Sequence, residues 1–170
     1  DVLVTDSAYM SAVPQYEETN LRLQDRVLPL VKEGQVPVMG GFIGANRSGI
    51  TTTIGRGGSD FSAAIFGAGL GADKIEIWTD VDGILTTDPR MCPDARRIKV
   101  ISFDEAAELA YFGAKVLHPA TVLPAIQKNI PVYVLNSRNP SCEGTRITTR
   151  APHTKNIFKA IAAKKRITIV

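Results

Sequence analysis

Residues 51–60 read Thr-Thr-Thr-Ile-Gly-Arg-Gly-Gly-Ser-Asp, and a mostly apolar stretch follows them as far as Leu70. The β-branched run favours a strand, the glycines favour a tight loop, and serine is a typical residue at a helix N-cap. We therefore predict a strand over residues 51–54, a loop, and a helix capped by Ser59. Strand, loop and helix in succession form the basic unit of α/β proteins.

The same alternation extends along the chain in both directions. Further strands are predicted at residues 36–43, 74–78 and 132–135. Further helices are predicted at residues 17–33, from Ser102 onward, and over residues 120–128. The second of these has a capping box, because Glu105 follows Ser102 by three residues. Such alternation favours a parallel sheet covered by helices, with ligands bound at the carboxyl ends of the strands.

Composition narrows the classes of partner. The chain has 170 residues, 44% of them hydrophobic, which suits one ordinary folded domain. The net charge is +3, but residues 151–170 hold five bases and no acid, which leaves 15 bases against 17 acids in residues 1–150. The basic character belongs to the tail, so nucleic acid is not an expected partner.

The cysteines and histidines indicate no disulfide framework and no metal site. Cys92 and Cys142 lie far apart without a CxxC spacing, which favours a reducing, cytoplasmic location. His118 and His153 have neither the partners nor the spacing of metal ligands. No apolar run approaches the ~20 residues of a membrane span, and no secretory signal occurs. We expect no metal bound by the chain's own ligands and no membrane partner.

Residues 67–72, Gly-Ala-Gly-Leu-Gly-Ala, match the dinucleotide-binding pattern letter for letter. They close a predicted helix and precede a predicted strand, which reverses the order that the pattern requires. We interpret them as close helix packing and a helix C-cap. No GxxxxGK[ST] sequence occurs, so a P-loop is excluded.

The loop Gly55–Asp60 is the first candidate site. Its glycines let backbone N–H groups approach an anion, and Arg56 adds a bidentate donor for carboxylate or phosphate. A glycine-rich turn before a helix cap explains the same residues about equally well. Asp60 is either a capping acid or a group that orients a catalytic cation.

A second polar cluster, Thr79-Asp80-Val81-Asp82-Gly83, follows the predicted strand 74–78. It lies at a carboxyl end, where ligands are expected, although Asp82-Gly83 also suits a plain turn. Arg90 follows Asp88-Pro89 further along the chain. Lys115 stands in an otherwise uncharged segment, and it is either solvated or placed to reach a phosphate.

Several segments together resemble aspartokinase, and the resemblance is strong over residues 36–147. They are Gly41-Phe42-Ile43-Gly44, Gly55–Asp60, Trp78–Gly83, Thr87-Asp88-Pro89-Arg90, Phe112–Pro119, Pro131-Val132-Tyr133-Val134 and Gly144-Thr145-Arg146-Ile147. The resemblance implies the amino-acid kinase (carbamate kinase-like) fold, a three-layer α/β/α sandwich, of which this chain is the C-terminal, nucleotide-binding part. It also implies homo-oligomeric assembly.

The resemblance implies transfer of the ATP γ-phosphoryl group to the side-chain carboxylate of L-aspartate, which gives 4-phospho-L-aspartate for lysine, threonine and methionine synthesis. Mg²⁺ would come with the ATP. The implied binding roles are Arg56 and Ser59 for aspartate, and Thr79, Asp80, Arg90 and Lys115 for the nucleotide. Asp60 and Lys115 are the implied catalytic residues, Asp60 as the group that orients catalytic lysines.

Two departures from the family pattern stand out. The chain has no lysine before Lys32 and no Gly-Gly before Gly40, so the family's N-terminal Lys-x-Gly-Gly loop is missing and the fragment alone is expected to be inactive. Leu85 stands where relatives often have a tyrosine beside the nucleotide. Another amino-acid kinase, such as glutamate 5-kinase, and a non-catalytic regulatory or assembly subunit remain alternatives.

The expected organisation is kinase domain over residues 1–150 and a basic linker over residues 151–170. The segment from Asn156 to Val170 resembles the start of a ligand-binding regulatory (ACT) module, most of which this chain lacks. A plain basic amphipathic helix is the alternative, although the β-branched run at residues 167–170 favours a strand.

Overall fold

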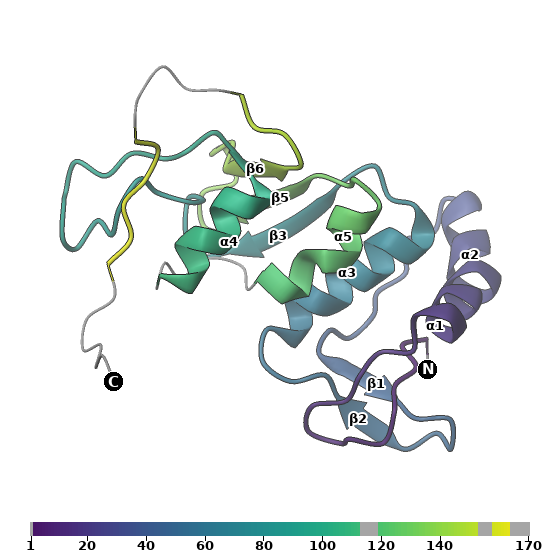
Figure 1. Ribbon diagram of the computed structural model, residues 1–170. Helices are drawn as coiled ribbons and strands as arrows, with labels where there is room; N and C mark the ends of the chain where they lie inside the picture. The colour runs from purple at the N-terminus through teal and green to yellow at the C-terminus, as the bar shows by residue number, and fades with distance from the viewer. Residues whose placement is uncertain (1, 113–118, 153–157, 164–170) are drawn as a thin grey trace, which may run out of the picture. The chain divides into compact units, whose positions relative to one another are not determined.

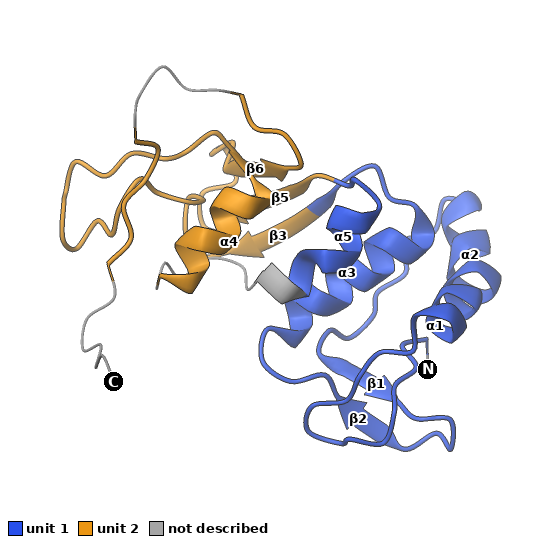
Figure 2. Cartoon of the chain, viewed as in Figure 1, with its two compact units in different colours: residues 1–75, 120–130 blue, residues 76–119, 131–170 orange. Residues whose placement is uncertain are grey.

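The computed structural model describes residues 2–112, 119–152 and 158–163, which form two compact units. Unit 1 contains residues 1–75 and 120–130, and unit 2 contains residues 76–119 and 131–170 (Figure 2). Each unit is therefore built from two separate stretches of chain.

Unit 1 combines helices with a short hairpin (Figure 1). The hairpin pairs β1 (Ile43–Ala45) with β2 (Thr51–Thr53) antiparallel. The helices are α1 (Tyr16–Arg22), α2 (Leu28–Lys32), α3 (Gly58–Leu70) and α5 (Leu123–Gln127), and the 3₁₀ turn η2 (Pro119–Val122) leads into α5. Leu3, Ile54 and Ile65 form a buried cluster with Phe61 and Phe66 packed against it.

The predicted helix over residues 17–33 is confirmed, but it contains a π-helical segment, η1 (Leu23–Val27), between α1 and α2. Pro29 lies in the first turn of α2 and has no N–H to donate to the preceding turn. The wider π turn accommodates the missing backbone hydrogen bond of the helix, while Leu23 and Val27 stay buried. Gly34, with φ of +80°, follows the end of the helix as predicted.

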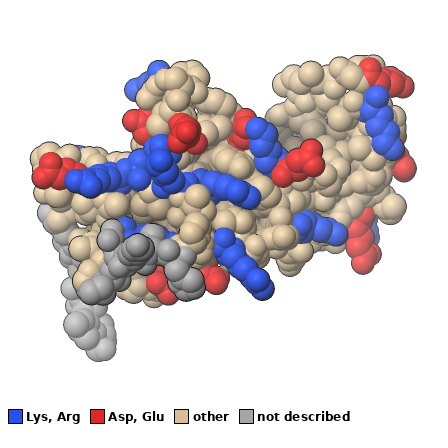
Figure 3. All heavy atoms as spheres, turned by 90° about the horizontal axis from the view of Figure 1, so that it is seen from above, with Lys and Arg blue, Asp and Glu red and all other residues tan. Residues whose placement is uncertain are grey.

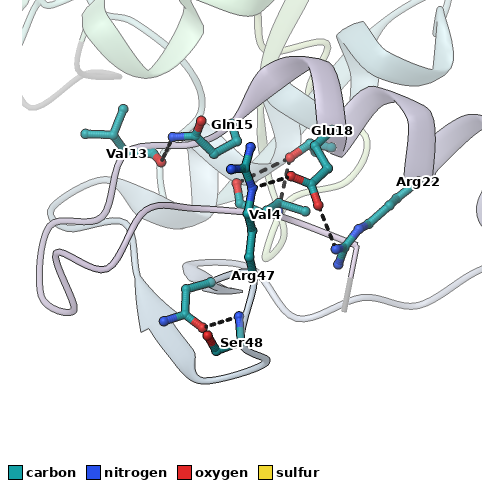
Figure 4. A network of polar contacts seen from close by, with 9 residues as sticks. Val4, Val13, Gln15, Glu18, Arg22, Arg47 and Ser48 are labelled. Atoms are coloured by element: carbon teal, nitrogen blue, oxygen red, sulfur yellow. Dashed lines mark hydrogen bonds and ion pairs between the residues drawn. The ribbon is translucent and has the colours of Figure 1, made fainter.

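A polar network holds α1 to the rest of unit 1 (Figure 4). The Glu18 carboxylate accepts from Arg22 Nη2 at 2.9 Å and from Arg47 Nε at 3.0 Å. The hydrogen bond from Arg47, with that from Arg22, lowers the pKa of Glu18 despite its partial desolvation. The amide of Val4 donates to Thr19 Oγ1 at 3.0 Å, so the N-terminal segment is fixed to the same helix.

The glycines near the end of α3 serve packing, as predicted. A Cβ on Gly69 would lie 2.5 Å from Leu23 Cδ1, and a Cβ on Gly67 would lie 2.6 Å from Ile75 Cγ1. Gly71, with φ of +66°, is the left-handed C-cap. Interpreting residues 67–72 as close packing and a C-cap is therefore confirmed.

The predicted strand over residues 36–43 is largely wrong. Only Ile43 belongs to a strand, while Val36 and Val38 are 85% and 94% exposed. Within the described ranges, no strand lies beside residues 36–41 to pair with them. An apolar, β-branched sequence becomes a strand only where such a neighbour exists.

Unit 2 is built on a four-stranded sheet of order β3–β5–β6–β4. The strands are β3 (Ile75–Thr79), β4 (Val100–Ser102), β5 (Val132–Asn136) and β6 (Thr145–Thr148). β4 pairs with β6 parallel, but β5 pairs with β6 antiparallel. The expected parallel sheet is thus corrected to a mixed one, because the chain turns back after β5 and inserts β6 beside it.

Helix α4 (Phe103–Tyr111) packs against β4 and β6, and the predicted capping box at its start is confirmed. Ser102 Oγ accepts from the Glu105 amide at 3.1 Å, and the Ser102 amide donates to Glu105 Oε2 at 2.8 Å. The Glu105 carboxylate also accepts from Lys159 Nζ at 2.7 Å and 2.8 Å. Part of the basic tail is therefore tied to this helix.

Charged side chains of both signs lie on the face drawn in Figure 3, where a row of Lys and Arg has acidic side chains beside it. A surface that carries charges of both signs is typical of a solvated face. Across the described residues, no helix has both the length and the apolar character needed to cross a membrane.

Candidate functional site

Two left-handed glycines shape the loop before α3 in unit 1. Gly55 and Gly57 have φ values of +78° and +72°, a region that glycine adopts at little cost. The amide of Gly58 donates to the carbonyl oxygen of Gly55 at 3.1 Å and closes a tight turn around Arg56. The Arg56 side chain is exposed. The backbone thus presents a guanidinium group at the start of the helix.

Ser59 and Asp60 lie in the first turn of α3. The prediction that Ser59 caps this helix is wrong, because Gly57 occupies the N-cap position and no side chain caps the helix. Ser59 is exposed and Asp60 is half-buried. Burial raises the pKa of the Asp60 carboxyl above its ordinary value.

Over the described ranges, the side chains of Arg56, Ser59 and Asp60 have no hydrogen-bond or ion-pair partner. Their polar groups are therefore available to a ligand. A cation beside Asp60 would offset the cost of burying its charge. Lys115, the cation implied for this role, lies outside the described residues.

Ser62 and Phe42 support this loop. Phe42 belongs to one of the segments that carry the family resemblance, but no role is predicted from the sequence for Phe42 or for Ser62. Ser62 Oγ donates to the Gly58 carbonyl at 2.7 Å and accepts from the Phe42 amide at 2.8 Å. Phe42 has φ of +72°, a costly value for a residue with a side chain. A Cβ on the adjacent Gly41 would lie 3.3 Å from Ser59 Cα, so the segment passes close to the helix start.

The predicted second cluster follows β3 in unit 2. Thr79 Oγ1 donates to Asp80 Oδ1 at 3.2 Å, and Asp80 is exposed. The Thr79 carbonyl accepts from both the amide and the hydroxyl of Ser137, at 2.8 Å and 2.9 Å. The structure thus keeps Thr79 and Asp80 together at the carboxyl end of a strand, as expected.

Arg90 is held by Asp88 in a two-pronged contact. Arg90 Nη2 lies 2.7 Å from Asp88 Oδ2, and Arg90 Nε lies 3.1 Å from Asp88 Oδ1. The hydrogen bond and charge of Asp88 raise the pKa of the guanidinium. Because Asp88 already satisfies two of its donors, an anion would have to share Arg90 or displace Asp88.

A cavity of about 360 Å³ lies in unit 2 beside Arg90. Its walls include Leu85, Asp88, Met91 and Leu109, and the tail residues 161–163. The amide of Ile161 donates to the Thr86 carbonyl at 2.8 Å, which fixes the tail along one side. Among the described nucleotide candidates, Arg90 lines this cavity, whereas Thr79 and Asp80 do not.

The loop after β3 depends on residues that the sequence reasoning missed. Thr145 Oγ1 accepts from the Ile84 amide at 2.8 Å and donates to the Ile98 carbonyl at 2.6 Å. Asn136 Nδ2 donates to Asp82 Oδ1 at 2.7 Å. The available signal was a polar residue in or next to a buried strand, and it did not reveal the partner.

The described residues hold no group of three or more His, Cys, Asp or Glu side chains that could bind a metal ion. Mg²⁺ commonly binds through one or two carboxylates together with substrate phosphates and water.

Comparison with known proteins gives consistent matches. The sequence profile of the amino acid kinase family matches residues 7–136. Lysine-sensitive aspartokinase 3 of Escherichia coli (strain K12) is 48% identical over 145 residues, which are 85% of this chain and 32% of that protein. Aspartokinase 2, chloroplastic, of Arabidopsis thaliana is 48% identical over 140 residues, which are 82% of this chain and 26% of that protein.

Comparison with a solved structure agrees with these sequence matches. E. coli aspartokinase III in complex with aspartate and ADP (R-state) matches with a TM-score of 0.84 and 46% identity, over 95% of this chain and 36% of that chain. The chain therefore spans about a third or less of the length of these relatives.

Proposed function

The chain belongs to the amino acid kinase family, and from this premise we propose that it is the nucleotide-binding part of an aspartate kinase. The reaction is transfer of the γ-phosphoryl group of ATP to the side-chain carboxylate of L-aspartate. Such transfers depend on positioning and charge neutralisation more than on covalent chemistry. The two polar loops supply groups of that kind.

The loop in unit 1 is proposed to bind the amino acid. Arg56 would pair with a substrate carboxylate, Ser59 would line the same pocket, and Asp60 would orient the catalytic lysines, Lys115 among them. The observation that carries the proposal is that Arg56, Ser59 and Asp60 lie together at the start of α3, without partners among the described residues, in a chain 48% identical to an aspartokinase.

The loops in unit 2 are proposed to bind the nucleotide. Thr79 and Asp80 would contact it at the end of β3, Arg90 would contact it beside the cavity, and Lys115 would neutralise phosphate charge. Mg²⁺ would bridge phosphate oxygens. Leu85 offers an aliphatic wall where an aromatic ring would stack, so we expect the affinity for the base to rest on apolar contact alone.

The tail from residue 151 onward is proposed as the link to a regulatory module. Two contacts support this assignment, the Lys159–Glu105 ion pair and the Ile161–Thr86 hydrogen bond. Both place the tail beside the cavity that Arg90 lines. A change in the tail could therefore reach the nucleotide loops through direct contact.

Equilibrium binding to the 170-residue chain tests the proposal, since the missing Lys-x-Gly-Gly loop argues against turnover. We expect L-aspartate to bind in calorimetric titration, and we expect Arg56→Ala to weaken it more than tenfold through loss of a charge-assisted hydrogen bond. Arg47→Ala, which removes another exposed arginine of unit 1, is the matched control and should leave the affinity unchanged.

L-Glutamate and Mg-ADP complete the experiment. Equal affinity for L-glutamate and L-aspartate would contradict the proposed substrate. Failure of Mg-ADP to bind would contradict the proposed nucleotide-binding role, whichever amino acid binds.

A further inference from the structure

We infer that Asp82 and Asn136 form a positioning pair that holds the loop Thr79–Gly83 in the shape required for nucleotide binding; this inference rests on the proposed function. Asn136 Nδ2 donates to Asp82 Oδ1 at 2.7 Å, across 54 positions of sequence. Asn139 Nδ2 approaches the same oxygen at 3.3 Å. The Asp82 carboxylate thus faces the end of β5.

The orientation of the Asn136 amide is fixed from its other end. Its Oδ1 accepts from the Arg138 amide at 2.9 Å, so the NH₂ group must face Asp82. Asn136 is only 8% exposed whereas Asp82 is exposed, so the contact between them is partly buried. A hydrogen bond to a carboxylate is stronger than one between neutral groups, and partial burial strengthens it further.

The loop backbone is held on both sides of Asp82. Ser137 secures the Thr79 carbonyl, and Thr145 secures the Ile84 amide. Between these anchors, the carboxylate of Asp82 provides the side-chain attachment. A simple Asp-Gly turn needs no partner 54 residues away, so the pair does more than form the turn.

The pair also decides which acidic group faces a ligand. Asp80 and Asp82 are both exposed, but one oxygen of Asp82 is held by the amide groups of Asn136 and Asn139. A carboxylate free to swing toward bound phosphates would repel them. Holding Asp82 against Asn136 therefore shapes the loop and keeps a negative charge away from an anionic ligand.

Exchange of the two residues tests the pair. Asn136→Asp places two carboxylates face to face with no donor between them, and we expect the Kd for Mg-ADP to rise roughly tenfold. Asp82→Asn keeps an amide oxygen that can accept from Asn136 Nδ2 and loses only the charge of the acceptor, so we expect a smaller rise of about threefold. The double variant D82N/N136D restores one amide–carboxylate hydrogen bond in reversed direction. We expect its Kd to return to within about threefold of the original, because the coupling belongs to the pair.

The measurements use the full 170-residue chain, with calorimetry and the fluorescence of Trp78, its single tryptophan, during Mg-ADP titration. Amide hydrogen exchange of residues 80–84, measured without nucleotide, is the second readout. It should be faster in both single variants and should return to the original rate in the double variant D82N/N136D. The Kd for L-aspartate, which binds in unit 1, should stay unchanged. Asn139→Ala, which removes only the longer contact, should raise the Kd for Mg-ADP less than threefold.

The outcomes separate the two proposals. If the unmutated chain does not bind Mg-ADP, the proposed function fails, while the hydrogen exchange still reports on the pair. The inference is overturned if the single variants leave the amide hydrogen exchange and the Kd for Mg-ADP unchanged. It is also overturned if the double variant D82N/N136D restores neither quantity. Equal weakening of L-aspartate and Mg-ADP binding would indicate general destabilisation and would also overturn it.

Discussion

The loop Gly55–Asp60 and the loop Thr79–Gly83 are both polar and contain glycine, but different parts of the chain fix them. Glycine conformations shape the first loop, and its side chains Arg56, Ser59 and Asp60 are unpartnered over the described ranges. Asn136 and Ser137 hold the second loop by donating to Asp82 and to the Thr79 carbonyl, and Thr145 accepts from the amide of the adjoining Ile84.

The difference separates two ways of building a binding loop. Where the backbone holds itself, the polar side chains remain available for a ligand. Where distant side chains hold the backbone, part of the polar content of the loop is structural, as for Asp82. A count of polar residues therefore overstates the number of side chains available to a ligand in the second loop more than in the first.

The largest expected loss of stability comes from adding a side chain at Gly83, where the second loop passes close to Thr145. Gly83 has φ of +118°, and a Cβ there would lie 2.5 Å from Thr145 Oγ1 and 2.9 Å from Thr145 N. We expect Gly83→Ala to lower the free energy of unfolding by about 3 kcal/mol, through strain and overlap together. Urea denaturation followed by circular dichroism and Trp78 fluorescence measures it.

Gly55→Ala is the matched change in the first loop. Gly55 also has positive φ, +78°, but its nearest neighbour would be 3.7 Å from the new Cβ. Only the backbone cost remains, about 1 kcal/mol. Equal losses in the two variants would show that the loops do not differ in how tightly their surroundings hold them.

The next effect concerns the anchor itself. Thr145→Val keeps the shape of the side chain but leaves the Ile84 amide and the Ile98 carbonyl without this partner. We expect a loss of about 2 kcal/mol in the free energy of unfolding, since Thr145 is fully buried. Thr53→Val, which removes an exposed hydroxyl contact to the Tyr9 carbonyl, should cost well under 1 kcal/mol. A smaller loss at Thr145 than at Thr53 would argue against a buried anchor.

Replacing Asp60 is expected to raise the stability of the folded chain slightly, whereas the changes above lower it. Because burial raises its pKa in the folded state, the folded chain binds the proton more tightly than the unfolded chain does. Stability therefore falls as pH rises between the ordinary pKa, about 3.9, and the raised value. At pH 7 we expect Asp60→Asn to raise Tm by roughly 2 °C, as measured by calorimetry.

The pH dependence provides the control for Asp60. Below the ordinary pKa the carboxyl is protonated in both states, so the difference in Tm should vanish there. Since Asp60 is proposed to orient a cation, the stabilised variant should also bind substrate less well. A lower Tm for Asp60→Asn at pH 7 would show that its charge is compensated in the folded chain.

The smallest effect concerns the tail. Burial opposes the ionisation of Glu105, but hydrogen bonds from Lys159 and Ser102 outweigh it and lower its pKa. The stabilisation is present above the ordinary pKa, about 4.3, and is lost as pH falls through the lowered value. We expect Glu105→Gln, which can retain the capping box, to lower Tm by about 1 °C at pH 7 and to quicken exchange of the Ile161 amide.

Lys159→Gln is the matched change on the other side of this ion pair. It should quicken Ile161 exchange to the same extent as Glu105→Gln, and the two changes together should add nothing further. Unaltered exchange in both variants would mean that the ion pair does not fix the tail.

Local signals in the sequence predicted the structure best. The capping box at Ser102 and the C-cap at Gly71 involve residues within one helical turn, and both are confirmed. The motif series predicted the amino acid kinase fold, which the family match and the similarity to aspartokinase III confirm. The start of α3 was misplaced because left-handed glycines, not a serine hydroxyl, set it.

Non-local features could not be predicted in the same way. Whether residues 36–41 form a strand depends on a neighbour, and the position of β6 between β5 and β4 depends on how the chain returns. The Asn136–Asp82 contact joins residues 54 positions apart, so neither residue type revealed it. Arg56, Ser59, Asp60, Thr79, Asp80 and Arg90 were singled out by motif, and their roles, like that of Lys115, stay predictions.

The interleaving of the two units has a consequence for synthesis. Helix α3 packs against α5, but residues 76–119 of unit 2 are translated between them. At about 5–20 residues per second, the ribosome takes several seconds to cover that interval. During this time the side of α3 that α5 will cover has no partner. A nascent chain paused between residues 76 and 119 should therefore recruit a chaperone more strongly than one that has released residue 130.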